Sequence, residues 1–559
     1  TLMRSSAASD VYKRQILDHY FYSDSAWSFG ACASLSETFA EKQRFSQVSQ
    51  KMLEAEDKSF ITLNAAEGAG RSAWVLGLGA SGRAAAQYLN DHGWRVHAFD
   101  TREAPAGLDA FCKAVPGCEM TLGGFPETTA PGVELVVMSP GVSPYFGAAA
   151  SVCASARKAG IPIVGEIELF AQELAYLKRT QGYAPKVIGI TGTNGKTTTT
   201  TLTTKMAAAA GLYAVAAGNI GPNAVAELSK AEAAGALPDI WVLELSSFQL
   251  ETTHTLNCTS AALLNITEDH LDWHGSIEAY AHAKGRIFAP DTVRVVNRED
   301  PLVMAELEKV DDREHSAARC FTFGATKPQK EGELGLMMAA HASQGYWLGL
   351  RDQMEVDVLF LPEFELLIRG RHNAMNALAA LGLITGAGIE TRPAIGVLRT
   401  YRGEPHRVEL VRTIEGRDFI DDSKGTNVGA VAAAVCGLAA QGRRILILMG
   451  GDGKGQDFTP LAKELKGRVA FAALIGRDAA KIREAVSPAG VATETFKTLE
   501  AAEDWLWEKS RPGDQILLSP ACASWDMFRD YAERSERFKA EAAKIADHVV
   551  PKADEAVQG

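Results

Sequence analysis

Short apolar runs that end in glycine-rich or polar loops recur along most of this chain, and stretches with helical spacing follow many of them. The run at 187–190 is apolar and rich in β-branched residues. It breaks into a glycine-rich loop, after which Lys196 and Thr197 open a Thr/Ala-rich helix. Short apolar runs bounded by turn residues are typical of buried strands. Strands that alternate with helices predict a mainly parallel sheet with helices on both faces.

Three regions of the chain show this alternation. The predicted strands lie at 73–79, 95–99 and 135–138 in the first region, at 187–190, 241–245 and 261–266 in the second, and at 419–422, 444–449, 470–475 and 515–518 in the third. We therefore predict an α/β fold of three domains. These are a Rossmann-like domain at 71–182, a central domain with a P-loop ATPase-like parallel sheet at 183–410, and a Rossmann-like domain at 411–550. Residues 1–70 are an uncertain leader, of which 1–15 resemble translated sequencing-adapter read-through, and 551–559 form a polar tail.

Bulk composition narrows the class of protein and its compartment. A chain of 559 residues is too long for one hydrophobic core. Its net charge of −12 argues against nucleic acid or an anionic membrane as the main partner, since either favours a basic surface. The eight cysteines form no C-x-x-C pair, which suits reduced thiols better than disulfides or a zinc site. No apolar run approaches the ~20 residues of a membrane span, and no signal peptide is recognisable. We predict a cytoplasmic monomer without a nucleic-acid partner.

The strand, glycine loop and helix at 187–198 predict an anion-binding site. Backbone N–H groups of such a loop converge on phosphate oxygens, and the helix dipole favours negative charge. Lys196 would reach the terminal phosphates, and the Thr197 hydroxyl would bind Mg²⁺. The strict P-loop pattern has glycine where Ile190 stands, so the loop is a variant. We expect ATP or GTP to bind through Gly192, Thr193, Asn194, Gly195, Lys196, Thr197 and Thr198.

Acidic and basic side chains follow the other strands of the second region. Glu244 directly follows an apolar run, where a carboxylate facing a phosphate loop is the usual second Mg²⁺ anchor; alternatively it is an exposed or capping carboxylate. His270 lies among acids at the end of the next strand, a place that favours a functional role over the commoner structural one. Lys284, taken alone, reads as a solvated helix lysine.

Glycines and polar loops mark the first and third regions. Gly77-x-Gly79-x-x-Gly82, followed by Asp100, is the dinucleotide fingerprint, although the same turn serves any nucleotide diphosphate. In the third region, the polar loops 422–427, 450–454 and 519–526 follow strands and together would build half of a substrate cleft. Any one of these loops, taken alone, is more often only a turn.

Taken together, these residues resemble the Mur ligase family of ATP-dependent amide-bond-forming enzymes. The variant loop Thr191-Gly-Thr-Asn-Gly-Lys-Thr197 is the family's own form. The other motifs that carry the resemblance are 166–170 (EIELF), 218–221 (GNIG), 243–250 (LELSSFQL), 267–270 (TEDH), 422–424 (DSK), 450–454 (GGDGK) and 518–524 (LSPACAS). The match runs in one frame from about 72 to 545. The Asp-Asn-Pro-Arg motif of relatives that add a diamino acid is absent, which favours the branch that adds D-glutamate.

The resemblance implies substrates, cofactors and a role for each site residue. ATP would activate the carboxylate of UDP-N-acetylmuramoyl-L-alanine as an acyl phosphate, which D-glutamate then attacks. Lys196, Glu244, His270 and Lys284 would be catalytic. Two Mg²⁺ ions would be held by Thr197, Glu244, His270 and Lys284, the last as a carbamate. Further ATP contacts would be Asn297, His406, Arg407 and Asp422. The UDP substrate would contact Gly79, Ala80, Ser81, Asp100, Thr101, Arg102, Ser139, Pro140, Gly141, Asn219, Ser246 and Gln249. D-Glutamate would contact Lys424, Thr426, Lys454, Ser524, Trp525 and Tyr531.

The chain departs from the family pattern at three positions near the predicted amino-acid pocket. Gly425 stands where alanine is common, Trp525 where leucine is common, and Tyr531 where phenylalanine is common. Other readings remain open at this point: a nicotinamide-dependent dehydrogenase based on the Gly77–Gly82 turn, a nucleotide-binding regulator or degenerate ligase, and a ligase of the same family with a folate or another amino acid as substrate.

Overall fold

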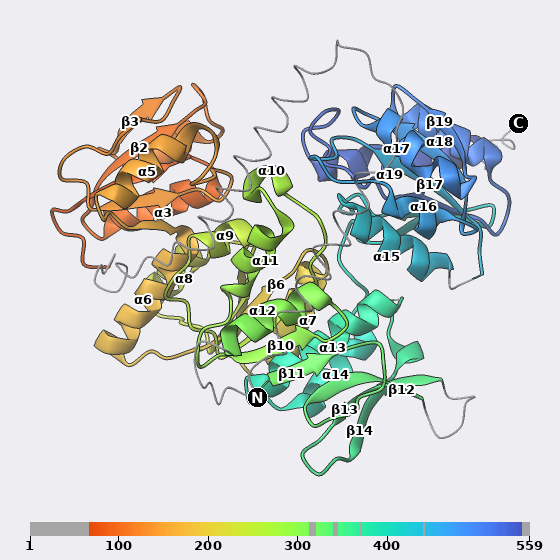
Figure 1. Cartoon of the computed structure of the whole chain (residues 1–559), viewed down its shortest axis with the longest axis horizontal. Helices are drawn as coiled ribbons and strands as arrows, with labels where there is room; N and C mark the ends of the chain where they lie inside the picture. Colours follow the sequence, from red (N-terminus) through yellow and green to blue (C-terminus); the bar gives the residue numbers. More distant parts are fainter. Residues whose placement is uncertain (1–65, 312–319, 339–344, 369, 440–441, 550–559) are drawn as a thin grey trace, which may run out of the picture. The chain divides into compact units, whose positions relative to one another are not determined.

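The computed structural model describes residues 66–549 except 312–319, 339–344, 369 and 440–441. The predicted leader up to residue 65 and the predicted tail at 551–559 lie outside the described residues. Within the described part of the chain, the strands form three sheets of five, nine and six strands, with the helices packed around them (Figure 1). The predicted α/β fold of three domains is therefore confirmed.

The first sheet is wholly parallel, in the order β3-β2-β1-β4-β5. Its strands are β1 (Ser72–Leu76), β2 (Arg95–Asp100), β3 (Glu119–Leu122), β4 (Leu135–Met138) and β5 (Ile163–Gly165), and its helices are α3 (Ala80–Asp91), α4 (Leu108–Ala114), α5 (Ala150–Lys158) and α6 (Glu166–Gln181). The run at 135–138 was expected to be the third strand, and this is wrong: β3 precedes it. β3 is a short edge strand whose side chains are mostly exposed, so it lacks the apolar run that marked the others.

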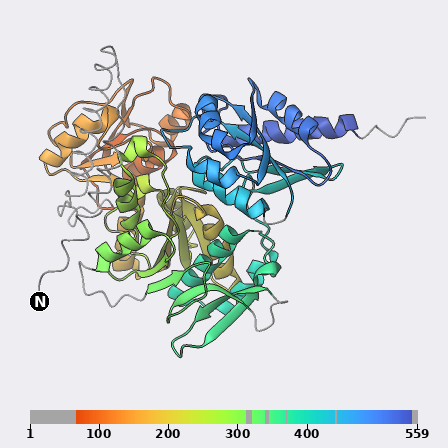
Figure 2. The same ribbon diagram turned by 45° about the vertical axis from the view of Figure 1, so that its right-hand side comes forward.

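The second sheet has the order β14-β13-β12-β11-β10-β9-β6-β8-β7. Its strands are β6 (Lys186–Thr191), β7 (Ala214–Gly218), β8 (Ile240–Glu244), β9 (Ser260–Leu263), β10 (Val293–Asn297), β11 (Cys320–Phe323), β12 (Glu333–Met338), β13 (Tyr346–Arg351) and β14 (Asp357–Pro362). The strands from β7 to β12 pair in parallel, whereas β13 pairs antiparallel with both β12 and β14. Figure 2 shows this antiparallel part at the lower edge of the sheet. The sequence did not predict it.

Helices cover both faces of the second sheet. They are α7 (Lys196–Ala209), α8 (Ala224–Ala233), α9 (Ser247–Glu251), α10 (Leu271–His274), α11 (Ile277–Gly285), α12 (Pro301–Asp311), α13 (Arg371–Gly386) and α14 (Thr391–Thr400). One apolar cluster includes side chains from both the first and the second sheet. In it, the Phe170 ring of α6 lies 5.3 Å from the ring of Trp241 on β8. The buried side of α6 therefore joins the two sheets.

The third sheet has the order β15-β16-β20-β17-β18-β19, and only the β15–β16 pair is antiparallel. Its strands are β15 (Glu409–Ile414), β16 (Arg417–Asp421), β17 (Ile445–Gly450), β18 (Val469–Ile475), β19 (Ala492–Thr495) and β20 (Gln515–Leu518). One core contains side chains of α15 (Val428–Ala439), α16 (Pro460–Leu465) and α17 (Ala479–Val486), and another contains side chains of α18 (Leu499–Lys509) and α19 (Tyr531–Val549). The sheet is therefore covered on both faces, as a doubly wound domain requires. Among the helices that the structure describes, none is long and apolar enough to cross a membrane.

Candidate active site

The glycine-rich loop leaves the carboxyl end of β6, in the middle of the second sheet, and enters α7. Gly195 has φ +84°, and a Cβ there would lie 2.3 Å from Oδ1 of Asn376. Gly192 has φ +150°, and a Cβ there would lie 2.9 Å from Cβ of Leu264. Because an L side chain would be strained and crowded at both positions, the loop geometry depends on these glycines.

β9 ends earlier than predicted because its last residues contact this loop. The sequence predicted a strand to residue 266, but the ladder ends at Leu263. The Asn265 carbonyl accepts the Thr193 N–H at 2.8 Å, and its side-chain oxygen accepts the Asn194 N–H at 2.8 Å. The residues after β9 therefore hold the glycine loop in place.

Two lysines, the buried Lys284 and the partly buried Lys196, converge on one carbonyl of the loop. The Lys196 ammonium donates to the Gly192 carbonyl at 2.7 Å and to the Thr193 carbonyl at 2.8 Å, while the Lys284 ammonium donates to the Gly192 carbonyl at 3.0 Å. Lys284 is only 1% exposed, so its interpretation as a solvated helix lysine is wrong. Burial, and next the Lys196 charge, lower the pKa of Lys284 well below its usual value. Burial also lowers the pKa of Lys196.

The Glu244 carboxylate has one oxygen available in the same region. Glu244 ends β8 and is 1% exposed, which excludes the exposed-carboxylate alternative. Asn219 donates its Nδ2–H to Oε1 at 2.9 Å, whereas Oε2 is buried without a hydrogen-bond partner among the described residues. A buried, unsatisfied carboxylate oxygen is costly unless a cation or donor reaches it. The donor set therefore fits a bound cation.

His270 lies next to an acid and close to both lysines. Its φ of +54° is in the left-handed region, and its Nε2 lies 3.7 Å from Oδ2 of Asp269. Burial lowers the pKa of His270 to about 4, which keeps the imidazole neutral, the form that binds metal. Glu244 and His270 do not form, with a third imidazole, thiolate or carboxylate of the described residues, a cluster of ligand atoms within 4.8 Å of one another.

A cavity of about 960 Å³ adjoins the glycine loop. Six of the predicted ATP-binding residues line it: Asn194, Gly195, Thr198, Asn297, Arg407 and Asp422. The sequence did not identify His372, Asn373 and Asn376, which line the same cavity from the first turns of α13. The available signal was the polar start of this helix (RHNAMN), which precedes an otherwise apolar stretch.

Arg407, at the junction between the second and third regions, and Asp422, in the third, both reach the cavity. The Arg407 guanidinium donates to the Thr197 hydroxyl of the loop at 2.7 Å. Asp422 is buried, and its carboxylate accepts the Ser519 hydroxyl at 2.7 Å. Burial raises the pKa of Asp422 to about 7. Two residues some 200 positions beyond the loop in sequence therefore lie at the same cavity as the loop itself.

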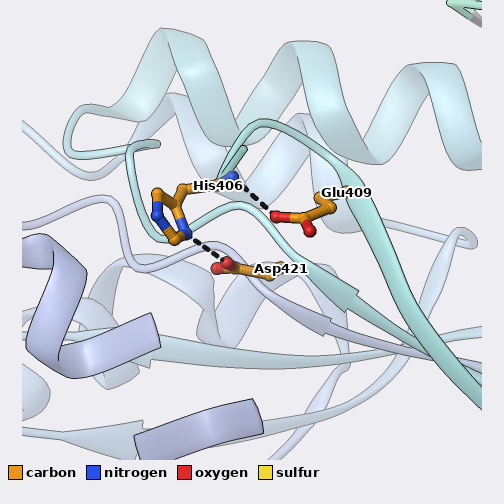
Figure 3. A group of neighbouring side chains, drawn as sticks. All are labelled: His406, Glu409 and Asp421. Atoms are coloured by element: carbon orange, nitrogen blue, oxygen red, sulfur yellow. Dashed lines mark hydrogen bonds and ion pairs between the residues drawn. The ribbon is translucent and has the colours of Figure 1, made fainter. Parts of the chain in front are cut away.

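The His406 side chain belongs to a polar cluster with Glu409 and Asp421 (Figure 3). Ligand atoms of these three residues lie within 4.8 Å of one another, the only such group found among the described residues. The Lys539 ammonium lies 2.9 Å from the Glu409 carboxylate and 3.6 Å from that of Asp421. Because an ammonium already supplies the positive charge, we interpret this cluster as an ion-pair network.

The predicted amino-acid-binding residues surround the loops after β16, β17 and β20. The Lys424 ammonium lies 5.0 Å from the centre of the Tyr531 ring, and the Lys454 ammonium lies 2.6 Å from the Asp269 carboxylate. Ser524 is buried, whereas Trp525 is 70% exposed. Thr426 donates its backbone N–H to the carbonyl of Lys424 at 3.0 Å.

Gly425, one of the departures from the family pattern, has a structural reason in this chain. A Cβ at this position would lie 2.4 Å from Oδ2 of Asp422. Alanine would therefore require the buried Asp422 carboxylate to move away from the Ser519 hydroxyl. The structure gives no comparable reason for Trp525 or Tyr531.

In the first sheet, the fingerprint glycines are required by packing. A Cβ on Gly82 would lie 1.8 Å from the Gly77 carbonyl oxygen. The Asp100 carboxylate accepts the Leu78 N–H at 2.7 Å and two N–H groups of the Arg102 guanidinium at 2.7 and 2.8 Å. The side-chain bond from Arg102 is the main reason why the pKa of Asp100 is lowered to about 2. The remaining predicted residues of this site follow the ends of β1, β2 and β4: Gly79, Ala80, Ser81, Thr101, Ser139, Pro140 and Gly141.

Two further predicted substrate contacts form a helix cap in the second region. Ser246 is the N-cap of α9, where its hydroxyl accepts the Gln249 N–H at 3.2 Å and its own N–H donates to Gln249 Oε1 at 2.9 Å. This capping box directly follows Glu244 and fixes the chain at that strand end.

The fold and the site define a three-domain α/β protein with a strand–glycine loop–helix unit at the carboxyl edge of its central sheet, a class that binds nucleotide phosphates. Protein-family models match it in three segments: a MurD-like N-terminal domain of Mur ligases at 71–165, the Mur ligase middle domain at 190–384, and the Mur ligase glutamate ligase domain at 406–522. The chain belongs to the Mur ligase family.

Curated relatives match nearly end to end. The UDP-N-acetylmuramoylalanine--D-glutamate ligase of Ralstonia nicotianae is 47% identical over 499 residues, covering 85% of this chain and 97% of the relative. The protein of the same name from Paraburkholderia xenovorans is 48% identical over 490 residues, covering 84% and 96%. These values confirm the family resemblance seen in the sequence.

Solved structures share the fold at low sequence identity. The UDP-N-acetylmuramate-alanine ligase MurC of Thermotoga maritima has a TM-score of 0.52 at 18% identity, covering 85% of this chain and 99% of that one. MurF of Acinetobacter baumannii has a TM-score of 0.52 at 18% identity, covering 87% and 93%.

Proposed function

We propose that this chain is an ATP-dependent ligase that joins D-glutamate to UDP-N-acetylmuramoyl-L-alanine in peptidoglycan precursor synthesis. The main support is a relative named for this activity, of which the match covers 97%. Lys196, the partly buried lysine of the glycine loop, lies next to loop residues that line a cavity of about 960 Å³ and would supply positive charge to a bound phosphate. The free thiols of the described cysteines fit a cytoplasmic location, and we expect a monomer.

The reaction must activate a poor electrophile, the L-alanyl carboxylate. One carboxylate oxygen attacks the γ-phosphorus of ATP, the bond to the bridging oxygen breaks, and ADP leaves with that electron pair. The unprotonated amine of D-glutamate then attacks the carbonyl carbon of the acyl phosphate, and phosphate leaves as the amide forms. Water would hydrolyse the acyl phosphate, so the site must exclude it.

Residues at the glycine loop would stabilise the charge that moves during phosphoryl transfer. Lys196 would shift its ammonium from the Gly192 and Thr193 carbonyls to the phosphate oxygens. Arg407, which donates to the Thr197 hydroxyl and lines the cavity, would supply a second cation there. Preorganised cations in a site closed to water act more strongly than they would in solvent. The two contacts support a role for both residues in nucleotide binding.

We further propose that Thr197, Glu244, His270 and a carbamylated Lys284 hold two Mg²⁺ ions. Bound magnesium would neutralise charge on the phosphate oxygens and on the group in transfer. The free Glu244 oxygen and the neutral His270 support these ligands. Lys284, fully buried with a strongly lowered pKa, offers the neutral amine that adds to CO₂. Its carbamate would place a negative charge beside the Lys196 ammonium.

The remaining assignments follow the three domains, for which we keep the bounds 71–182, 183–410 and 411–550. The UDP moiety would bind at the strand ends of the first sheet, ATP in the cavity, and D-glutamate among Lys424, Thr426, Lys454, Ser524, Trp525 and Tyr531. The ammonium groups of Lys424 and Lys454, both partly buried on these loops, support a pocket for a dicarboxylate.

The decisive experiment is phosphate release with ATP, Mg²⁺ and UDP-N-acetylmuramoyl-L-alanine, comparing D-glutamate with L-glutamate, D-aspartate and L-lysine. We expect release with D-glutamate alone. The Lys196→Ala variant should lose roughly 10²–10³-fold in rate, as for removal of one preorganised charge donor. A preference for another amino acid would reject the assigned pocket, and near-normal turnover of the variant would reject the role of Lys196.

Carbamylation of Lys284 has its own test. Protein depleted of CO₂ should lose activity and regain it on addition of bicarbonate, and intact-protein mass spectrometry should detect the added CO₂. Lys284→Arg introduces a guanidinium, which does not form this carbamate, so the activity of this variant should not respond to bicarbonate. Full activity of the CO₂-depleted wild-type protein would contradict the carbamate.

A further inference from the structure

Arg407 lies between two residues with an unusual backbone. His406 has φ +64° and Val408 has φ +51°, both in the left-handed region that non-glycine residues rarely adopt. Such conformations persist only where the surroundings hold them, and they concentrate at functional sites. The turn at 406–408 therefore needs contacts that fix it.

The side chain of His406 is anchored on two residues from other elements. Its Nδ1 lies 2.8 Å from Oδ2 of Asp421, at the end of β16, and 2.8 Å from the hydroxyl of Ser535, on α19 (Figure 3 shows the first contact). The Ser535 hydroxyl donates to the same Asp421 oxygen at 2.6 Å. Asp421 and Ser535 are both fully buried, so the triad is a fixed part of the third domain's interior.

The backbone of the turn is held on its other side. The His406 N–H donates to the Glu409 carboxylate at 2.9 Å, and the Lys539 ammonium of α19 donates to the same carboxylate at 2.9 Å. Hydrogen bonds therefore hold the turn to β16, through the His406 imidazole and Asp421, and to α19, through Ser535 and Lys539.

Arg407 is the residue that this anchoring orients. Its guanidinium leaves the turn toward the second sheet and donates to the Thr197 hydroxyl at 2.7 Å, and the residue lines the cavity beside the glycine loop. The Arg407 Nε–H is buried without a hydrogen-bond partner among the described residues, so the side chain retains a donor for a ligand.

We propose that Asp421 and Ser535 are positioning residues that hold the His406 imidazole and thereby aim Arg407 at the nucleotide. The imidazole then acts on ATP through the backbone of the turn, and not by a direct contact as the sequence suggested. This inference rests on the proposed function only in taking ATP as the ligand of the cavity.

The test is ATP affinity, measured by calorimetry without turnover, in Ser535→Ala. We expect affinity to fall roughly tenfold, the size expected for lost hydrogen bonds to a charged group. Ser535→Thr keeps the hydroxyl and should restore most of the affinity. Thr459→Ala is the control, because its hydroxyl also donates to a carboxylate, that of Asp457 at 2.5 Å, and neither residue lines the cavity or touches the turn. An equal loss in Thr459→Ala would overturn the proposal.

A double-mutant cycle separates positioning from general destabilisation. If Ser535 acts through His406, adding Ser535→Ala to a His406→Ala variant should lower the ATP affinity little further. Additive losses would reject the coupling. Asp421→Asn, which keeps the size of the side chain, should weaken ATP binding in the same way and serves if Ser535→Ala does not fold. A wild-type protein that binds ATP but ligates no amino acid would refute the proposed function and leave this cycle valid.

Discussion

Lys424, a partly buried lysine of the third domain, has a pKa close to the pH at which the enzyme would be assayed. Its ammonium lies 5.0 Å from the centre of the Tyr531 ring, a cation–π contact. Burial, followed by the positive charge of Arg407, lowers the pKa of Lys424 to about 8. A lysine of lowered pKa loses its charge as pH rises, so this side chain is cationic below pH 8 and neutral above it.

The lowered pKa of Lys424 predicts a pH dependence of D-glutamate binding. If Lys424 pairs with a carboxylate of D-glutamate, the KM for D-glutamate should rise as pH increases through about 8, because the cationic form is lost. Lys424→Arg keeps its charge at these pH values and should have a KM that changes little between pH 7 and pH 9. The same rise in Lys424→Arg would show that another group is responsible.

At the scale of helices and strands, the sequence predicted most of the buried strands and missed exposed ones, although it also missed the short buried strand β5. β8, β17 and β20 are buried throughout, β6 is buried except at Lys186, and all four had clear apolar runs. β3 and β19 lie at sheet edges with exposed side chains, and β14 presents Val358 and Leu359 to solvent. An edge strand packs on fewer neighbours, so its sequence is less constrained. In α13, the long apolar stretch indicated a buried helix, so there was no reason in the sequence to assign its polar first turns to the cavity.

Packing of α18 against α19 buries an acid that the proposed reaction does not use. Glu503 on α18 is 0% exposed, and neither carboxylate oxygen has a hydrogen-bond partner among the described residues. Burial, and next the carboxylate of Glu541 on α19, raise the pKa of Glu503 well above its usual value. Folding therefore favours the protonated form of this side chain, whereas the unfolded chain leaves the carboxyl free to ionise.

Glu503 should make the protein less stable as pH rises. Because folding takes up a proton at this site, the free energy of unfolding should fall above the unfolded pKa of about 4.3. Glu503→Gln has no charge to bury and should be more stable than wild type at pH 8, with a smaller difference at pH 5. Urea unfolding at both pH values measures this. Glu508→Gln, exposed on the same helix, is the control, and an equal gain there would contradict the explanation.

At the scale of the whole molecule, the glycine loop is met by residues that lie far along the chain. Its Thr197 contacts Arg407, 210 positions away, and its Asn194 contacts Asn427, 233 positions away. Asp269, after β9, pairs with Lys454, 185 positions away. Periodicity and local motifs carry no information on such pairs. The sequence located the two halves of the site through family motifs, whereas only the structure shows which side chains join them.

The Asn194–Asn427 pair predicts that the third domain contributes to ATP binding through a side-chain amide. The two amides exchange hydrogen bonds at 3.2 and 3.3 Å, and Asn427 Oδ1 also accepts the Ala430 N–H at the start of α15 at 2.8 Å. Asn427→Ser retains a good capping residue but is too short to reach the loop. ATP should therefore bind this variant about 1 kcal/mol more weakly, reducing the thermal stabilisation that saturating ATP gives the wild-type protein.

The matched control for Asn427→Ser is Asn223→Ser. Asn223 stands at the N-cap position of α8 without a side-chain capping bond, and its amide donates to the Ser81 hydroxyl of the first domain at 3.1 Å, so it too is an asparagine before a helix with a long-range contact. Both variants should lower Tm without nucleotide, because Asn427→Ser loses the two amide hydrogen bonds to Asn194 and Asn223→Ser loses one to Ser81. Only Asn427→Ser should also lose part of the rise in Tm with ATP. An undiminished rise in that variant would mean that the third domain contributes to nucleotide binding through Asp422, beside Arg407, without help from the amide pair.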